Sequence, residues 1–266
     1  MTARTRLRVA ASLGVLTLGA LMMLVVATAT LFLARRFYSE VIGRAIGRAI
    51  LALWGVRYRV LLVGGAEIPR RQTVYVANHT STLDAFLLIA MGLPRTRFFL
   101  SGFLRRGIPP LGIIGMLIRI FWTVPQEFPE RRRRIFARAA RILARTGDSV
   151  FLSPEGMRVL NGEIGRFNKG AFHLATSLAA PIVPIYFRIP SAIDPGMGYE
   201  ASAGLVDVYV LPAIDTSGWT VAEVERNRDR VHELFVRVND SVRSTGATPA
   251  NLALEPVAPQ PEGVLV

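Results

Sequence analysis

The sequence of 266 residues contains no cysteine, only three histidines and a single lysine, Lys169. The absence of cysteine excludes disulfides, zinc–thiolate sites and thiol catalysis. Acidic residues are also few: 19 Asp and Glu stand against 32 Lys and Arg, which gives a formal net charge of +13 at pH 7. Because nearly all of this positive charge is arginine, the composition favours anionic partners such as phosphorylated small molecules, acidic lipid head groups or an acidic protein.

The sequence also lacks a nucleic-acid-binding motif, and its aromatic residues do not alternate with the arginine clusters. We therefore expect no nucleic-acid partner. Two of the histidines, His173 and His232, lie in helical patterns with no group of acidic residues around them. We interpret both as structural, and we expect no metal site.

What the sequence does contain is a long apolar run near its start. Residues 9–34 carry no charge, and as a helix they would span about 39 Å, more than the ~30 Å hydrocarbon core of a bilayer. A cleaved signal peptide is the alternative, because residues 27–29 have the small-x-small form of a cleavage site. The apolar run before that point is longer than the core of a usual signal peptide, so we favour an uncleaved anchor.

A second helix is predicted over residues 37–54, with an apolar side and a polar side that carries Arg44 and Arg48. Such a helix can lie in the membrane interface with its arginines among the head groups, or it can pack on the folded domain as an ordinary amphipathic helix. We predict that residues 1–54 form a membrane anchor, either a transmembrane helix or an interfacial helical hairpin. Basic residues flank both ends of the apolar run, so these charges alone do not fix its orientation in the membrane. We expect the protein on the cell membrane, with its folded domain on the cytoplasmic face.

Residues 55–243 alternate short apolar strands with helical patterns, which is typical of an α/β fold. The predicted strands are residues 56–62, 74–77, 97–100, 120–124, 149–152, 182–188 and 204–211. The predicted helices are residues 83–93, 109–118, 129–146, 168–179 and 220–242. We expect a mixed, mostly parallel central sheet covered by helices. Residues 244–266 are rich in proline and small residues and are predicted to be a disordered tail.

The polar residues after the strand at residues 74–77 are the first candidates for chemistry: His79 lies in the loop, and Asp84 stands where the next helix begins. On a regular helix the two would lie about 140° apart, so they meet only if the chain turns between them. The Asp84 carboxylate would then accept a hydrogen bond from one imidazole nitrogen and leave the other free as a base for a substrate hydroxyl. The alternative is a loop histidine that caps the helix, with Asp84 favoured there by the helix dipole.

The predicted helix at residues 129–146 carries a one-sided positive charge. Five of its arginines lie within about 80° on a helical wheel, opposite an apolar stripe: Arg131, Arg134, Arg138, Arg141 and Arg145. A solvated polar face is one interpretation, but such faces usually mix signs, and no acidic residue follows Glu130 in this helix. The stripe would attract phosphate-bearing or acidic partners.

A second strand, residues 149–152, also ends in a polar loop, with the sequence Ser-Pro-Glu-Gly-Met-Arg at residues 153–158. Taken with Asn78, His79 and Asp84, this loop resembles the motifs of the glycerolipid acyltransferase family, whose best-known members acylate lysophosphatidic acid. The first three residues match the family's NHxxxxD motif. The loop is similar to its PEGTR motif, with methionine in place of threonine.

Two further segments resemble the same family and follow in the same order. Phe-Asn-Lys-Gly-Ala-Phe at residues 167–172 is similar to its F-x-x-G-A-F segment, and Val-Pro-Ile at residues 183–185 matches its VPI motif. The resemblance covers about residues 55–215. A lone HxxxxD pattern is weakly specific, but four motifs in order and at the expected spacing are specific.

The resemblance implies a membrane-bound O-acyltransferase. It would move a fatty acyl group from a thioester, acyl-CoA or acyl carrier protein, to the hydroxyl of a lysophospholipid-like acceptor, in the first instance 1-acyl-glycerol-3-phosphate. His79 would be the general base and Asp84 would orient it, with no covalent acyl-enzyme and no cofactor beyond the thioester co-substrate. The expected partners are therefore membrane lipids, acyl-CoA or acyl carrier protein, and a phosphate-bearing lysolipid acceptor.

The resemblance also assigns substrate-binding residues. Arg158 would hold the acceptor's phosphate in a bidentate contact, and Glu155 would orient the loop or Arg158. Gly156 would allow a close backbone approach or a positive φ, and Asn78 completes this set through its place in the first motif. Lys169 is interpreted as a solvated surface residue.

The chain departs from the family pattern at residues 120–125, where an apolar strand lacks the basic residue that helps to hold the acceptor's phosphate. A different lipid or hydroxylated acceptor is therefore one alternative. A catalytically idle lipid-binding protein is another, although a protein that only binds has no need of both His79 and Asp84. A hydrolase that activates water with His79 is the third.

Overall fold

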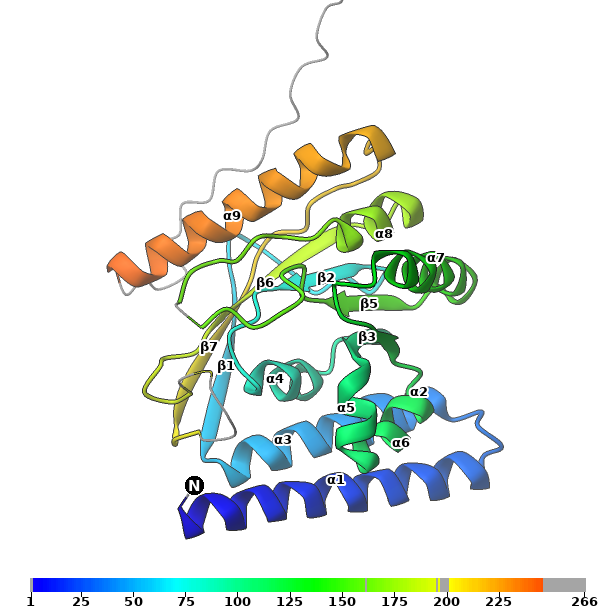
Figure 1. The fold of residues 1–266 in the computed structure, drawn as a ribbon, viewed down its shortest axis with the longest axis vertical. Helices are drawn as coiled ribbons and strands as arrows, with labels where there is room; N and C mark the ends of the chain where they lie inside the picture. The colour runs from blue at the N-terminus through cyan, green and yellow to red at the C-terminus, as the bar shows by residue number, and fades with distance from the viewer. Residues whose placement is uncertain (1, 161, 195, 197–200, 246–266) are drawn as a thin grey trace, which may run out of the picture.

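A seven-stranded sheet forms the middle layer of the computed structural model, which describes residues 2–160, 162–194, 196 and 201–245 (Figure 1). The strands follow the order β1-β7-β6-β2-β5-β3-β4. Their bounds are β1 Val56–Leu62, β2 Val74–Ala77, β3 Thr96–Ser101, β4 Phe121–Thr123, β5 Ser149–Leu152, β6 Ile182–Arg188 and β7 Gly204–Val210. Among these strands only the β6–β7 pairing is antiparallel. The mixed, mostly parallel sheet expected from the sequence is confirmed.

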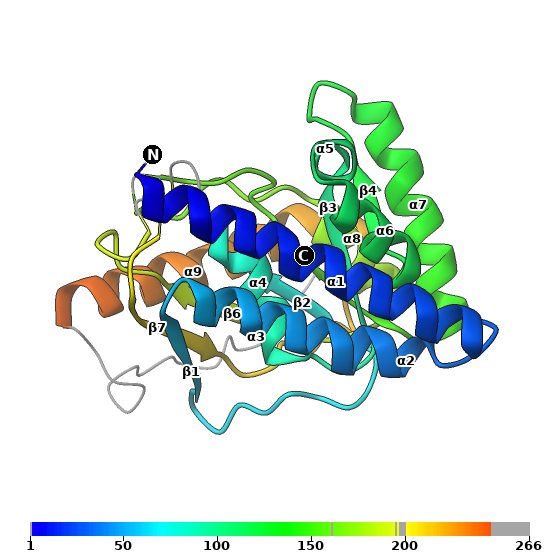
Figure 2. The same ribbon diagram turned by 90° about the horizontal axis from the view of Figure 1, so that it is seen from below.

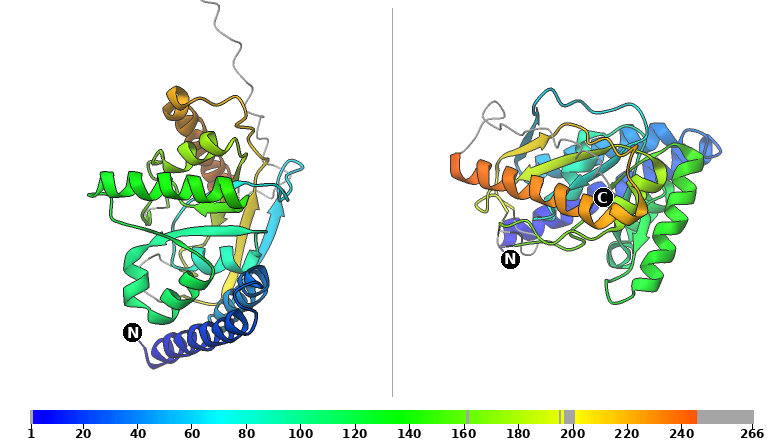
Figure 3. Two further views of the ribbon diagram at one scale, coloured as in Figure 1. Left: turned by 90° about the vertical axis from the view of Figure 1, so that its right-hand side faces the viewer. Right: turned by 90° about the horizontal axis from the view of Figure 1, so that it is seen from above.

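Helices cover both faces of this sheet (Figures 1 and 3). On one face lie α1 Ala3–Ala29, α2 Arg35–Phe37, the π-helix η1 Tyr38–Ile42, α3 Gly43–Leu53, α4 Leu83–Met91, α5 Gly102–Gly107 and α6 Pro109–Leu117. On the other face lie α7 Pro129–Thr146, α8 Gly170–Leu178, the 3₁₀-helix η2 Val221–Glu223 and α9 Val224–Thr245. The result is a three-layer α/β arrangement, in which the central strands are covered from both sides.

Strand β2 shows how the sequence produces these layers. All four of its residues are buried, and successive side chains point to opposite faces. Tyr75 and Ala77 pack in the hydrophobic cluster under α1, α3, α4 and α6. Val74 and Val76 pack in the cluster under α7, α8 and α9. A strand buried on both faces reads as a continuous apolar run, and its polar continuation then lies at the edge of the sheet.

The N-terminal helices pack along the α/β part rather than apart from it. Figure 2 shows α1 and α3 side by side beneath the sheet, and both contribute to the same hydrophobic cluster as α4 and α6. Glycine makes the approach close: a Cβ on Gly47 would lie 2.9 Å from the backbone nitrogen of Ala90 and 2.9 Å from the backbone oxygen of Phe86. The helix α3 therefore lies directly on α4, the helix that begins beside the first candidate site.

The predicted boundaries of these first helices were wrong in part. The first helix begins at Ala3 and ends at Ala29 rather than spanning residues 9–34. Leu31 and Phe32 have positive φ values of 48° and 63°, which end the helix in a turn. The second predicted helix is divided into α2, a π-helical turn and α3.

Later boundaries differ by smaller amounts. The helix α4 ends at Met91, because Gly92 takes the left-handed conformation with φ of 66° at its C-terminus. The helix α5 was not predicted, and α8 begins at Gly170 rather than at residue 168. The helix α9 continues to Thr245, so the first two residues of the predicted disordered tail are helical. The rest of that tail lies outside the described residues.

Candidate active site

The topology brings the two polar loops together at one edge of the sheet. The strands β2 and β5 are neighbours and run parallel, with Val76 opposite Leu152. Their carboxyl ends therefore meet, and the loops after them carry His79 and residues 153–158. A backbone hydrogen bond joins the loops directly, from the Val159 nitrogen to the His79 oxygen at 2.8 Å.

His79 and Asp84 form the hydrogen-bonded pair expected from the sequence. The distance from His79 Nδ1 to Asp84 Oδ2 is 2.8 Å, and the Asp84 side chain is 5% exposed whereas that of His79 is 34% exposed. With Asp84 ionised, Nδ1–H donates to the carboxylate, so the tautomer leaves Nε2 as an acceptor. The pair therefore combines a buried carboxylate with an imidazole that solvent can reach.

The turn between the two residues is held by the same carboxylate. Asp84 Oδ2 also accepts the backbone N–H groups of Thr80 at 2.8 Å and Ser81 at 3.0 Å. Asp84 lies in the first turn of α4, where the helix dipole favours a negative charge. One oxygen atom thus closes the loop and holds the imidazole, and its place in the first turn of α4 agrees with the effect of the helix dipole.

Asn78 lies beneath the site and not on its surface. Its side-chain amide donates to the Phe187 oxygen at 3.0 Å, and its amide oxygen accepts from the Phe187 nitrogen at 2.8 Å. Asn78 is 2% exposed, so its polar groups are used within the protein. The side chain therefore fastens the loop to β6, and a substrate contact of Asn78 stays a prediction.

Glu155 connects the two loops through their backbones. Its carboxylate accepts the N–H of His79 at 2.5 Å and that of Gly165 at 2.8 Å, and the residue is 3% exposed. Burial raises the pKa of Glu155 to about 7, and the two backbone donors oppose this shift. Of the two predicted roles, the structure supports orientation of the loop and not of Arg158.

Gly156 and Arg158 have separate surroundings within the same loop. Gly156 has a φ of 74°, as expected, and a Cβ there would lie 2.9 Å from Gln126 Nε2. The exposed guanidinium of Arg158 donates from Nη1 to Thr82 Oγ1 at 2.9 Å and to the Gly196 oxygen at 3.0 Å. Arg158 therefore reaches from its own loop to Thr82, which ends the His79 loop and precedes α4.

Arg132 is a cation beside this loop that the sequence did not single out. Its Nη1 donates to the Val124 oxygen at 2.9 Å, and its Nη2 would lie 4.0 Å from a Cβ on Gly156. Partial burial lowers the pKa of Arg132, with a smaller opposing effect from Glu127. It stands in a run of four arginines, and only the packing of α7 shows that this one turns inward.

A polar cleft lies against the same loop. It has a volume of about 570 Å³ and is lined by Gln126, Glu155 and Asn168 together with three cationic side chains, Arg166, Lys169 and Arg228. Lys169 forms an ion pair with Glu225 on α9, so it is a paired surface residue. The cleft offers amides and positive charge to a ligand that carries a phosphate.

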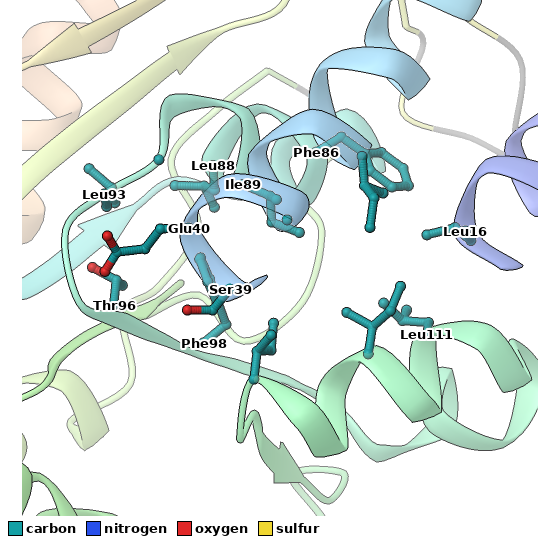
Figure 4. Close-up of a pocket in the computed structure, with 15 residues that line it drawn as sticks. Leu16, Ser39, Glu40, Phe86, Leu88, Ile89, Leu93, Thr96, Phe98 and Leu111 are labelled. Carbon is teal, nitrogen blue, oxygen red and sulfur yellow. The ribbon is translucent and has the colours of Figure 1, made fainter. Parts of the chain in front are cut away.

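A narrow apolar pocket of about 40 Å³ lies between α4 and the neighbouring helices α1, α3 and α6 (Figure 4). Leu16, Phe86 and Leu111 surround one end of it, and Glu40 and Thr96 lie near the other. Residues of α1, η1, α3, α4, β3 and α6 line the pocket, and it is much smaller than a usual ligand pocket. Within the described ranges, no group of three or more His, Asp or Glu side chains has the arrangement of a metal site.

Comparisons with known proteins agree with the motifs. The family model described as Acyltransferase matches residues 59–188. The human protein 1-acyl-sn-glycerol-3-phosphate acyltransferase beta is 31% identical over 210 residues, which cover 76% of this chain and 73% of that protein. The 1-acyl-sn-glycerol-3-phosphate acyltransferase of Limnanthes douglasii is 24% identical over 197 residues, or 73% of this chain and 68% of that one.

The fold has a solved counterpart. The crystal structure of the 1-acyl-sn-glycerophosphate acyltransferase PlsC from Thermotoga maritima aligns with a TM-score of 0.64 at 21% identity, covering 88% of this chain and 97% of that one. At 21% identity this crystal structure shows a likeness of fold alone. The human relative, at 31% identity, shows the family. The chain therefore belongs to the glycerolipid acyltransferase family, and it is an acyltransferase.

Proposed function

We propose that this enzyme transfers a fatty acyl group from a thioester donor to the free hydroxyl of 1-acyl-glycerol-3-phosphate at a membrane surface. The observation that carries this proposal is the pair His79 and Asp84, in which a buried carboxylate holds Nδ1 at 2.8 Å and leaves Nε2 accessible. The human and Limnanthes relatives are named as 1-acyl-sn-glycerol-3-phosphate acyltransferases, which supports this choice of acceptor.

The reaction needs one base and no covalent enzyme intermediate. Nε2 of His79 takes the proton of the acceptor hydroxyl while the oxygen attacks the thioester carbonyl carbon. The tetrahedral intermediate collapses as the C–S bond breaks, and the sulfur leaves with the proton that the imidazolium returns. Asp84 keeps Nδ1 protonated and stabilises the positive charge on the ring during the step.

Two arginines at the loops that carry His79 and Glu155 would receive the acceptor's phosphate. Arg158 lies on the side of the loop that faces the start of α4, and Arg132 approaches Gly156 from α7. Charge-assisted hydrogen bonds from a guanidinium to a phosphate are short and strong. Arg132 would supply the positive charge that residues 120–125 lack, which makes a phosphate-bearing acceptor compatible with this sequence.

The membrane contact is proposed for the helix α1 and its surroundings. The helix Ala3–Ala29 is long and apolar enough to cross a bilayer, yet one side of it is buried along α3 and α6. The other side exposes large apolar residues, and further ones follow in the turn after it and on α5 and α6: Leu18, Leu21, Met22, Val25, Leu31, Phe32, Leu33, Phe103 and Met116. A helix that packs along its length on the domain fits the interfacial hairpin better than an isolated span.

The test is an acyl-transfer assay with purified protein, a labelled acyl-CoA and a panel of acceptors: 1-acyl-glycerol-3-phosphate, lysophosphatidylcholine and monoacylglycerol. The expected product is labelled phosphatidic acid from the first acceptor. Labelled free fatty acid as the only product would show a hydrolase and contradict the proposal. Acylation of monoacylglycerol in preference to the phosphate-bearing acceptor would contradict the assigned acceptor.

A further inference from the structure

The arginine stripe of α7 is a continuous exposed cationic surface. All five of its members, Arg131, Arg134, Arg138, Arg141 and Arg145, are exposed. Within the described parts of the chain none of them forms an ion pair with an acidic side chain, and Glu130 is paired with Arg133, outside the stripe. Five like charges along one helix repel one another unless an anionic partner neutralises them.

The position of the stripe argues against a membrane as that partner. The helix α7 packs with α8 and α9 in the hydrophobic cluster on one face of the sheet, and α1 packs in the cluster on the other face. Figures 1 and 3 show α7 and α1 on opposite sides of the sheet. Exposed charges are screened beyond a Debye length of about 8 Å at physiological salt, so a bilayer held by the exposed side of α1, with the sheet in between, would attract the stripe only weakly. The C-terminal end of α7 comes nearest to the α1 side, through Asp148, which is paired with Arg35.

The length of the stripe argues against a small anion. From Arg131 to Arg145 the helix rises about 21 Å, which exceeds the reach of a single phosphate group. A surface of this length and one sign fits an extended acidic surface, such as a helix of an acidic protein. The N-terminal end of the stripe also adjoins the candidate site, since the residue after Arg131 is Arg132, which approaches Gly156.

We infer that the exposed face of α7 is a docking surface for an acidic acyl carrier protein, which delivers the acyl thioester to His79. The inference rests on the proposed function and selects one of the two donors that it allows. The carrier would lie along α7 and extend its phosphopantetheine arm past the N-terminal end of the helix to the polar loops. The chemistry remains the transfer described above, with the carrier's thiol as the leaving group.

The experiment compares two donors in two charge-reversal variants of the full chain. The stripe variant is Arg138→Glu with Arg141→Glu, and glutamate keeps the helix because its propensity is close to that of arginine. The control is Arg57→Glu on β1 with Arg237→Glu on α9, both exposed and outside the stripe. Both double variants lower the net charge by the same four units, from +13 to +9. Each is assayed with palmitoyl-CoA and with palmitoyl-acyl carrier protein from the same source.

We expect the stripe variant to lose about tenfold or more in kcat/KM for the carrier-bound donor, to change less than about twofold with palmitoyl-CoA, and the control variant to match the wild type with both. Equal losses with both donors, no loss with either, or a wild type that accepts only palmitoyl-CoA would each overturn the inference. These outcomes leave the proposed function standing, because transfer from palmitoyl-CoA persists. A wild type that transfers from neither donor contradicts the proposed function itself.

Discussion

Replacement of Glu155 by glutamine is expected to change how the stability of the protein depends on pH. Burial raises the pKa of this carboxyl from the ordinary value of 4.5 to about 7. Between these values the folded state keeps a proton that the unfolded chain has already released. Rising pH therefore favours unfolding over this window, and the stability that the protonated group allows below pH 4.5 is lost as the pH passes through 7.

The magnitude follows from the two pKa values. At about 1.4 kcal/mol for each pH unit, the wild type should lose on the order of 3 kcal/mol of unfolding free energy between pH 4.5 and pH 7 because of this group alone. Glu155→Gln removes the titration. Glutamine can accept only one of the two N–H groups of His79 and Gly165, so the variant also carries a constant penalty that does not vary with pH.

The assay is urea unfolding in detergent micelles at several pH values, followed by tryptophan fluorescence. The informative quantity is the difference between the unfolding free energies of wild type and Glu155→Gln, which should change by about 3 kcal/mol across the window. Glu67→Gln changes an exposed carboxyl, so its unfolding free energy should depend on pH in the same way as that of the wild type. A difference for Glu155→Gln that stays constant with pH would refute the reasoning, because the carboxyl would then titrate alike in both states.

Three further perturbations test the packing, the phosphate site and the membrane contact. Gly47→Ala should destabilise the protein by about 1–3 kcal/mol in thermal unfolding, because its Cβ meets α4 backbone atoms at 2.9 Å. Gly14→Ala is the control, because nothing lies within 4 Å of the added Cβ, and it should be neutral or stabilising by up to about 1 kcal/mol. Equal changes in stability for the two variants would contradict the close packing of Gly47 on α4. Arg158→Ala should raise KM for a phosphate-bearing acceptor by about tenfold or more and leave KM for the acyl donor nearly unchanged; a rise for the donor alone overturns the assignment. The wild type should stay bound to vesicles at about 1 M salt. The double variant Leu21→Asp with Val25→Asp, on the exposed side of α1, should no longer sediment with them. If its sedimentation is unaltered, this side of α1 is not the membrane contact.

The fold could be predicted from the sequence wherever local patterns decide it. The strand β2 is a short apolar run between polar neighbours, and the apolar period of α7 is regular over 18 residues. The turn after Ala29 was missed, because Leu31 and Phe32 give no sign in the sequence of their positive φ values. The opposite direction of β7 to β6 is set by packing and connection and not by composition.

The same division holds for the candidate site. The pair His79 and Asp84 is close in sequence, so a strand, a loop and a helix start were sufficient to predict that they meet. Glu155 reaches the His79 backbone across 76 positions, and Asn78 reaches Phe187 across 109. The choice between substrate contact and backbone contact depends on that long-range geometry, so the sequence could name these residues but not their hydrogen-bond partners. Arg132 was hidden for the same reason, among identical neighbours on α7.

The central claim is that His79 acts as the general base on the acceptor hydroxyl. Its most direct test is the kcat for acyl transfer to 1-acyl-glycerol-3-phosphate in His79→Ala, with His173→Ala, at an exposed histidine of α8, as the matched control. Loss of a general base costs about 10²–10⁴-fold in rate, so His79→Ala should fall by that factor while His173→Ala keeps the wild-type rate and both variants stay folded. A folded His79→Ala enzyme that retains more than about a tenth of the wild-type kcat would contradict the account.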